Sequence, residues 1–161
     1  MKHLLLILLF VPLISFGQIK TLDELKRITS QETFERVCIE NGYEKSKELM
    51  VIHQEDCYIV YALNPTFNDK NEILSQGFAV YYTSEKEMNS FRFNFENSKP
   101  YDYNENYDNI FDEVKSNCDY LDISERKNIA FSTYDCLPNG KLGFGKNEGS
   151  NIIHYFPKKT P

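Results

Sequence analysis

One short pattern occurs twice in the chain. FERVCIENGY occupies residues 34–43 and FDEVKSNCDY occupies residues 111–120, so the copies lie 77 positions apart (111 − 34 = 77). Both read Phe, acid, any residue and Val, and both end in Tyr. A fixed period indicates a structural unit that is built more than once. The alternative is a chance match, since three shared apolar positions are common. The cysteines also differ between the copies, because Asn41, and not Cys38, stands at the position that matches Cys118.

The N-terminus has the features of a secretory leader. Lys2 and His3 precede an apolar run of 11 residues, Leu4 to Ile14, and Ser15-Phe16-Gly17 supplies small residues before a cleavage site. Residues 1–17 are therefore predicted to be a signal peptide. Because about 20 apolar residues are needed to span a membrane, an N-terminal anchor is disfavoured. We expect a secreted or periplasmic protein that has no membrane contact once the leader is removed.

The rest of the chain is acidic and of single-domain size. Residues 18–161 number 144 (161 − 17 = 144), and loss of Lys2 changes the formal net charge from −6 to −7 (−6 − 1 = −7). A chain this acidic, without a cluster of Lys or Arg, is a poor candidate for binding nucleic acid. We expect two small units, residues 18–99 and residues 100–161, that pack as one domain.

Four cysteines follow the leader: Cys38, Cys57, Cys118 and Cys136. An even number of cysteines in an exported chain predicts two disulfides, for which three pairings exist. We favour Cys38–Cys57 and Cys118–Cys136, because each bridge would join a helix to a strand that follows it. A structural zinc site is disfavoured, since its ligands usually come in pairs about two to four residues apart and no such pair is present.

Capping signals and apolar spacing predict three helices. Thr21–Glu24 and Thr29–Glu32 fit the capping box, in which a hydroxyl and a carboxylate satisfy free backbone N–H groups. Asn41-Gly42 would end the second helix, because Gly readily adopts the left-handed cap conformation. The predicted helices cover residues 22–28, 30–40 and 107–118.

Alternation and β-branched or aromatic composition predict six strands. The clearest is FRFNFE, residues 91–96, in which every second residue is Phe, as in a sheet with one wet face. Residues 45–52 carry a mixed signal that allows a strand near residues 49–53. The polar stretch 66–76 is expected to be an exposed hairpin loop. The predicted strands cover residues 57–63, 77–83, 91–96, 129–136, 141–146 and 151–156.

The order of these elements is helix, strand, strand, strand, followed by the same order again. Helices grouped with antiparallel hairpins indicate an α+β fold. We therefore predict two tandem units, each a helix plus a three-stranded antiparallel sheet, packed as one compact domain. In each unit the Phe, Val and Tyr of the repeated pattern would dock the helix on its own sheet.

This organisation resembles the beta-lactamase inhibitor protein family, whose members are secreted and have two tandem helix-plus-antiparallel-sheet units, each with a disulfide. The resemblance covers most of the chain and rests on element order and repeat length. It involves no residue-level motif, so it assigns no binding residue. It implies an inhibitor or immunity-type protein that acts by binding another protein.

Tyrosines on the predicted strands suggest how such binding would occur. Consecutive strand positions face opposite sides, so Tyr81 and Tyr82 cannot both face the core. Tyr offers a large contact area at a small entropic cost. We predict a non-catalytic binding module whose partner is another protein and whose contact is an aromatic sheet face, with ordinary cross-strand packing as the alternative. The residues assigned to this face are Tyr58, Tyr61, Tyr81, Tyr82, Tyr134 and Tyr155.

A small secreted hydrolase is the second hypothesis. Beyond the leader the chain has two histidines, His53 and His154, and either could perform acid–base chemistry beside a carboxylate. His154 alternates with Ile152 and Phe156, which favours a packed strand position instead. The chain has neither a serine-nucleophile turn nor a phosphate loop. We therefore assign no catalytic residue and expect no cofactor.

A calcium-binding domain is the third hypothesis. Within Asp102–Glu113, side-chain oxygens fall at positions one, three, five, seven and twelve, the spacing of an EF-hand loop. Tyr107 occupies position six, where that loop needs Gly, and Asn109 occupies position eight, which is normally apolar. A capped, acidic helix start explains the same residues, so no metal ligand is assigned.

Overall fold

The computed structural model of the chain describes residues 17–52, 57–70, 73–83, 90–97 and 103–158, so the predicted leader lies outside it except for Gly17. Its helices are α1 (Leu22–Lys26), α2 (Gln31–Glu40) and α3 (Glu105–Asn117). Each helix begins after a side chain that accepts a backbone N–H bond, and these side chains belong to Thr21, Ser30 and Asn104. The three predicted helices are therefore confirmed, although the second capping box joins Ser30 to Thr33.

All six predicted strands are present, together with four others. The strands are β1 (Tyr43–Ile52), β2 (Cys57–Leu63), β3 (Thr66–Phe67), β4 (Ile73–Leu74), β5 (Gly77–Tyr82), β6 (Ser90–Glu96), β7 (Asp119–Arg126), β8 (Ile129–Leu137), β9 (Gly140–Asn147) and β10 (Ser150–Pro157).

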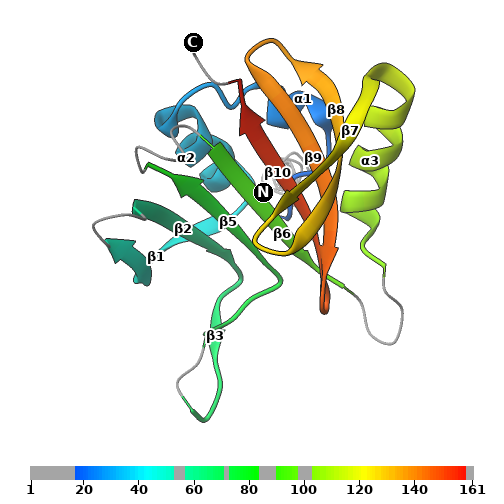
Figure 1. Cartoon of the computed structure of the whole chain (residues 1–161). Coiled ribbons are helices and arrows are strands. Elements are labelled where there is room, and N and C mark those ends of the chain that lie inside the picture. The colour runs from blue at the N-terminus through cyan, green and yellow to red at the C-terminus, as the bar shows by residue number, and fades with distance from the viewer. Residues whose placement is uncertain (1–16, 53–56, 71–72, 84–89, 98–102, 159–161) are drawn as a thin grey trace, which may run out of the picture.

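Eight of these strands form one antiparallel sheet in the order β1-β2-β5-β6-β10-β9-β8-β7. The prediction of an α+β fold is confirmed, but the prediction of two units with a three-stranded sheet each is wrong. Four strands follow α2 in the sheet and four follow α3, and the last strands of the two sets, β6 and β10, pair with each other. The helices therefore share one sheet (Figure 1).

The edges of this sheet are β1, of which the sequence indicated only a strand near residues 49–53, and β7, which was not predicted. β1 reads YEKSKELMVI and β7 reads DYLDISER, and both carry charges at alternating and adjacent positions. An edge strand is half solvated, and charged side chains there discourage pairing with other chains. Such a strand lacks the apolar alternation by which the inner strands are recognised.

The helices pack on one face of the sheet, and Phe34 of α2 lies at the centre of an aromatic cluster there. This side chain is fully buried, and its ring contacts those of Tyr61, Tyr81, Phe91 and Phe93. The alternation predicted for residues 91–96 is confirmed, because the three Phe side chains are buried in this core while the intervening side chains are not. The hydrophobic core thus lies between the helices and the sheet.

The repeated pattern occupies the same kind of element in both places, a helix followed by an edge strand. Val37 of α2 and Val114 of α3 are both buried. Phe111, the counterpart of Phe34, is half-buried, and Tyr120 is 56% exposed although its ring contacts that of Tyr134. The first copy is therefore packed more completely than the second.

A hydrogen bond links the helices of the two halves. The Leu22 backbone N–H at the start of α1 donates to Glu113 Oε2 of α3 over 2.9 Å. None of the helices in the described part of the chain is both long enough and apolar enough to span a membrane.

One of the two predicted disulfides is formed. Asp119 of β7 pairs with Asp135 of β8, which brings the preceding and following residues, Cys118 and Cys136, to a Cα–Cα distance of 5.2 Å. Their disulfide joins the end of α3 to β8, as predicted.

The predicted Cys38–Cys57 bridge is absent, because Cys38 carries a free, fully buried thiol. Cys38 lies near the end of α2 and is close to Tyr43. Burial is the main cause that raises the pKa of Tyr43, and Cys38 acts in the same direction. Tyr43 pairs with Leu63, at the opposite end of β2 from Cys57. Six residues of strand span about 20 Å, far more than the distance that a disulfide bridges. Sequence spacing does not show this separation.

Candidate functional site

The predicted binding tyrosines are almost all buried. Four of them, Tyr61, Tyr81, Tyr134 and Tyr155, belong to the core beneath the helices. Tyr82 is also buried, at 5% exposure, and only Tyr58 is half-exposed. The six residues are therefore not brought together as one exposed face. Strand alternation predicts the side that a residue faces, but not whether that side is covered.

Tyr82 and Tyr58 point to the other side of the sheet, away from the helices. They pack with Val60, Val80 and Phe78 in a second, smaller hydrophobic cluster. In Figure 1, α1 and α2 lie behind the strands, so this side carries no helix in front of it. We call it the helix-free face, and its residues are Tyr58, Val60, Phe78, Val80, Tyr82, Ser90, Arg92, Asn94, Phe131, Ile152, His154 and Phe156.

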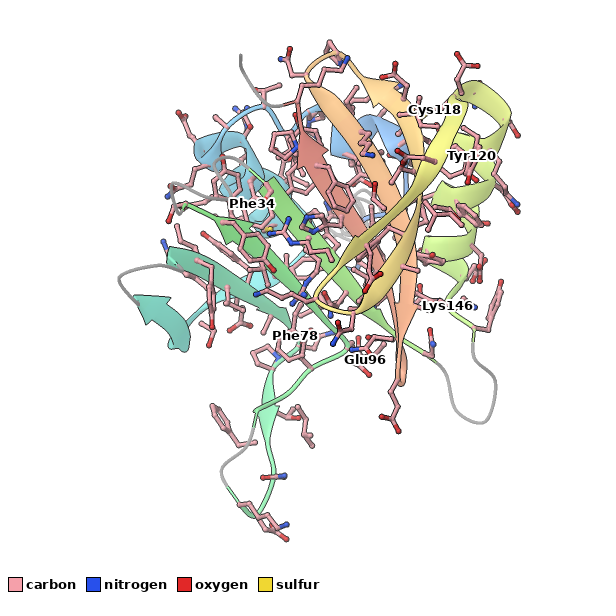
Figure 2. All side chains as sticks on the ribbon, viewed as in Figure 1. Phe34, Phe78, Glu96, Cys118, Tyr120 and Lys146 are labelled. Carbon is pink, nitrogen blue, oxygen red and sulfur yellow. A yellow bond between two sulfur atoms is a disulfide. The ribbon has the colours of Figure 1, made fainter. Side chains whose placement is uncertain are left out.

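Half-exposed aromatic side chains occur on this face. Tyr58, Phe78 and Phe156 are each neither buried nor fully exposed. Phe78 is the second residue of β5 (Figure 2), and the ring of Tyr58 contacts that of Tyr82. Phe156 contacts His154, with 4.5 Å between the ring centroids. The face therefore presents aromatic groups that are held in place by buried neighbours.

The sheet curls toward this face. Arg126, at the end of edge strand β7, lies over the Tyr82 ring of β5 at 5.2 Å from its centroid. Five strand-to-strand steps separate β7 from β5 in the sheet order, which is about 24 Å in a flat sheet. An Arg side chain cannot span that distance, so β7 must fold back over the face. Figure 1 shows β7 and β8 crossing in front of β10.

Glycines and bulges allow this curl. The pairing register shifts within β7–β8 and within β8–β9. A Cβ atom at Gly143 would lie 2.6 Å from the Phe156 ring, and one at Gly145 would lie 2.8 Å from the Phe131 ring. Bulges bend a strand, and glycine permits close approach of a neighbour. The glycine-rich sequence GFGKNEG thus provides space for rings on the helix-free face.

His154 is the most buried titratable group on this face, with 1% exposure. Arg126 Nη1 lies 2.6 Å from His154 Nε2. Because a guanidinium can only donate, Nε2 must be the acceptor, and the ring proton of the neutral imidazole is on Nδ1. Burial is the main cause that lowers the pKa of His154 from 6.5 to about 2. The positive charges of Arg126, Arg92 and Lys127 act in the same direction.

These properties do not suit a hydrolytic role for His154. A general base needs a pKa near the operating pH and an accessible lone pair. The pKa of His154 is far below that range, and its only lone pair in the ring plane faces Arg126. The prediction of a packed strand position is confirmed. His53 lies outside the described residues.

The buried histidine predicts acid sensitivity. An unfolded imidazole takes up a proton near pH 6.5, whereas folded His154 does so only near pH 2, so its contribution to stability is complete above pH 6.5 and is lost as the pH falls. Between about pH 7.5 and pH 5 we expect this residue to cost about 2 kcal/mol of unfolding free energy. Urea unfolding of wild-type and His154→Gln protein at both pH values measures it. Equal losses in the two proteins would contradict the assignment.

The proposed calcium loop is not formed. α3 begins at Glu105, so Asn106, Asp108 and Glu113 lie on a helix instead of a loop. Asn104 caps that helix by accepting the Tyr107 N–H, and Glu113 binds α1. Among the residues that the structure describes, no group of three or more His, Cys, Asp or Glu side chains is placed to hold a metal ion. Asp102 lies outside those residues.

Two exposed apolar places were not found by sequence reasoning. The stretch predicted as a loop, residues 66–76, contains a two-stranded hairpin of β3 and β4 that projects from the sheet (Figure 1). It carries Phe67 and Leu74, which are 55% and 53% exposed. Edge strand β7 exposes Tyr120 (Figure 2), Leu121 and Ile123. Aromatic and aliphatic residues within polar stretches are the signal that would have located both places.

No protein-family model, curated protein or solved structure matches this chain.

Proposed function

We propose that the chain is a secreted or periplasmic module that binds another protein through the helix-free face. The observation that carries this proposal is the set of half-exposed aromatic side chains, Tyr58, Phe78 and Phe156, on the same face as the half-buried Arg92. Aromatic residues and Arg dominate the binding energy of protein interfaces. An inhibitor or immunity-type role is one version of this function.

The Cys118–Cys136 disulfide supports the proposed location, because such bonds persist in oxidising compartments. The free Cys38 does not oppose it. Its thiol is fully buried, and burial raises its pKa well above the ordinary value. A thiol that is neither ionised nor accessible reacts slowly with oxidants.

A capture experiment with matched variants tests the proposed face. Immobilised wild-type protein is incubated with an extract of the source cells, and retained proteins are identified, purified and titrated by calorimetry. We expect Tyr58→Ala combined with Phe78→Ala to weaken binding about tenfold or more, because anchoring contact area is lost.

The control is Phe67→Ala combined with Leu74→Ala, which removes exposed apolar area from the projecting hairpin instead. It should bind as wild-type does, and thermal melts should show that both variants are folded. If the hairpin variant alone loses the partner, or if wild-type protein retains none, the proposal is wrong.

A further inference from the structure

The helix-free face contains hydrogen-bond donors that have no acceptor within the described part of the chain. The buried atoms Arg92 Nε, Ser90 Oγ and His154 Nδ1 lack a hydrogen-bond partner there. Ser90 and Arg92 lie on the same side of β6, and His154 of β10 is the register partner of Arg92. Asn94 Oδ1, on the same side of β6, is a buried acceptor without a partner, so the donors outnumber the acceptors by three to one. A buried donor without an acceptor costs about 1–3 kcal/mol, so this excess indicates a missing acceptor.

The charge around these donors is positive. The charges that lower the pKa of His154 belong to Arg126, Arg92 and Lys127. Within the described ranges, Arg92 has no ion pair with a carboxylate, although the protein as a whole carries a net charge of −6. A site with several donors and positive charge selects an oxyanion, and the planar guanidinium fork matches a carboxylate well.

We propose that a carboxylate side chain of the partner protein, from Asp or Glu, binds to Arg92 and Ser90 beside His154. This inference rests on the proposed function and specifies the chemistry of the partner. Arg92 is half-buried, so part of its side chain is exposed, whereas its Nε atom and the side chains of Ser90 and His154 are buried. The half-exposed Tyr58, Phe78 and Phe156 would exclude water around the ion pair, which strengthens a charge-assisted hydrogen bond.

Acetate is the probe for the carboxylate site. Nitrogen-15 spectra of the full-length protein are recorded while acetate replaces chloride at constant ionic strength. We expect saturable shifts of the Arg92 Nε–H and Ser90 backbone signals. Arg92→Gln should abolish saturation, and Arg92→Lys should weaken binding about tenfold, because Lys lacks the fork. Arg36→Gln, an exposed Arg on α2, is the matched control and should leave the shifts unchanged.

A sulfate titration separates a carboxylate site from a site for any anion. Stronger saturation by acetate than by sulfate supports the proposal. Saturation by sulfate alone would assign the site to a tetrahedral anion and would overturn it. Absence of saturation with both anions would also overturn it, because the donors would then not be available to a ligand.

A second experiment tests the carboxylate site with the captured partner protein. Its carboxylates are neutralised by carbodiimide coupling to glycinamide, and we expect its affinity for wild-type protein to fall about tenfold or more. The affinity for Arg92→Gln should already be low and should change little on neutralisation. Unchanged affinity in the wild-type experiment would overturn the carboxylate inference while the proposed function stands. If only the hairpin variant, Phe67→Ala combined with Leu74→Ala, fails to bind the partner, the proposed function itself is overturned.

Discussion

Replacing Phe34 by alanine is expected to lower the free energy of unfolding by about 3–5 kcal/mol. The side chain is fully buried and is in ring contact with four aromatic residues of three strands, β2, β5 and β6. Its removal would leave a cavity that these rings cannot fill, because each is held by its own strand. Urea unfolding, followed by far-ultraviolet circular dichroism, measures the loss.

Phe111→Ala is the matched control for this change, since Phe111 is the counterpart of Phe34 in the repeated pattern. Phe111 is only half-buried on α3, so its replacement should cost clearly less, about 1–2 kcal/mol. An equal or larger loss at Phe111 would mean that the core is not centred under α2, and it would contradict the packing of the sheet around Phe34.

Loss of the Cys118–Cys136 disulfide is expected to cost about 3 kcal/mol. The two residues are separated by 18 positions. A disulfide that closes a loop of that length stabilises the folded protein by about 3 kcal/mol, because it restricts the unfolded chain. Cys118→Ser combined with Cys136→Ser should therefore unfold at lower urea concentration than wild-type protein. Wild-type protein treated with a phosphine reductant should show the same loss.

The reductant also tests the assignment of Cys38. Because Cys38 carries a free thiol, the double Ser variant should have the same stability with and without reductant. A further loss of stability in that variant on reduction would reveal a second disulfide and would contradict the structure.

The helices and the inner strands were predictable because their signals are local. Capping side chains such as Thr21 and Asn104 satisfy backbone groups only a few residues away. The alternation of Phe91, Phe93 and Phe95 with polar residues reports directly on one buried and one partly solvated side. Neither signal depends on which other strand is the neighbour.

The pairing of β6 with β10 could not be read in the same way. It joins residues such as Phe93 and Ile153, which are 60 positions apart (153 − 93 = 60), and no turn between the two strands sets their register. The edge strands β1 and β7 were likewise obscured, because solvation of an edge removes the alternation that identifies a strand. The number of strands per unit was wrong for this reason.

In the candidate site, too, the local features were predictable and the long-range contacts were not. Alternation correctly separated Tyr81 from Tyr82, and the packed position of His154 followed from its apolar neighbours. The contact of Arg126 with His154 depends on the curl of the whole sheet, to which bulges and glycines in two strand pairs contribute. No local pattern in the sequence reports such a long-range bend.

The ring nitrogens of His154 test the curled sheet most directly. Nitrogen-15 spectra are recorded from about pH 4 to pH 8, with His3→Gln and His53→Gln used to assign the three histidines. A neutral ring is expected throughout, with a proton on Nδ1 and a bare Nε2 that accepts from Arg126, because β7 folds over β10. Titration of His154 near pH 6.5 would show that the ring is solvated and that β7 does not cover the helix-free face.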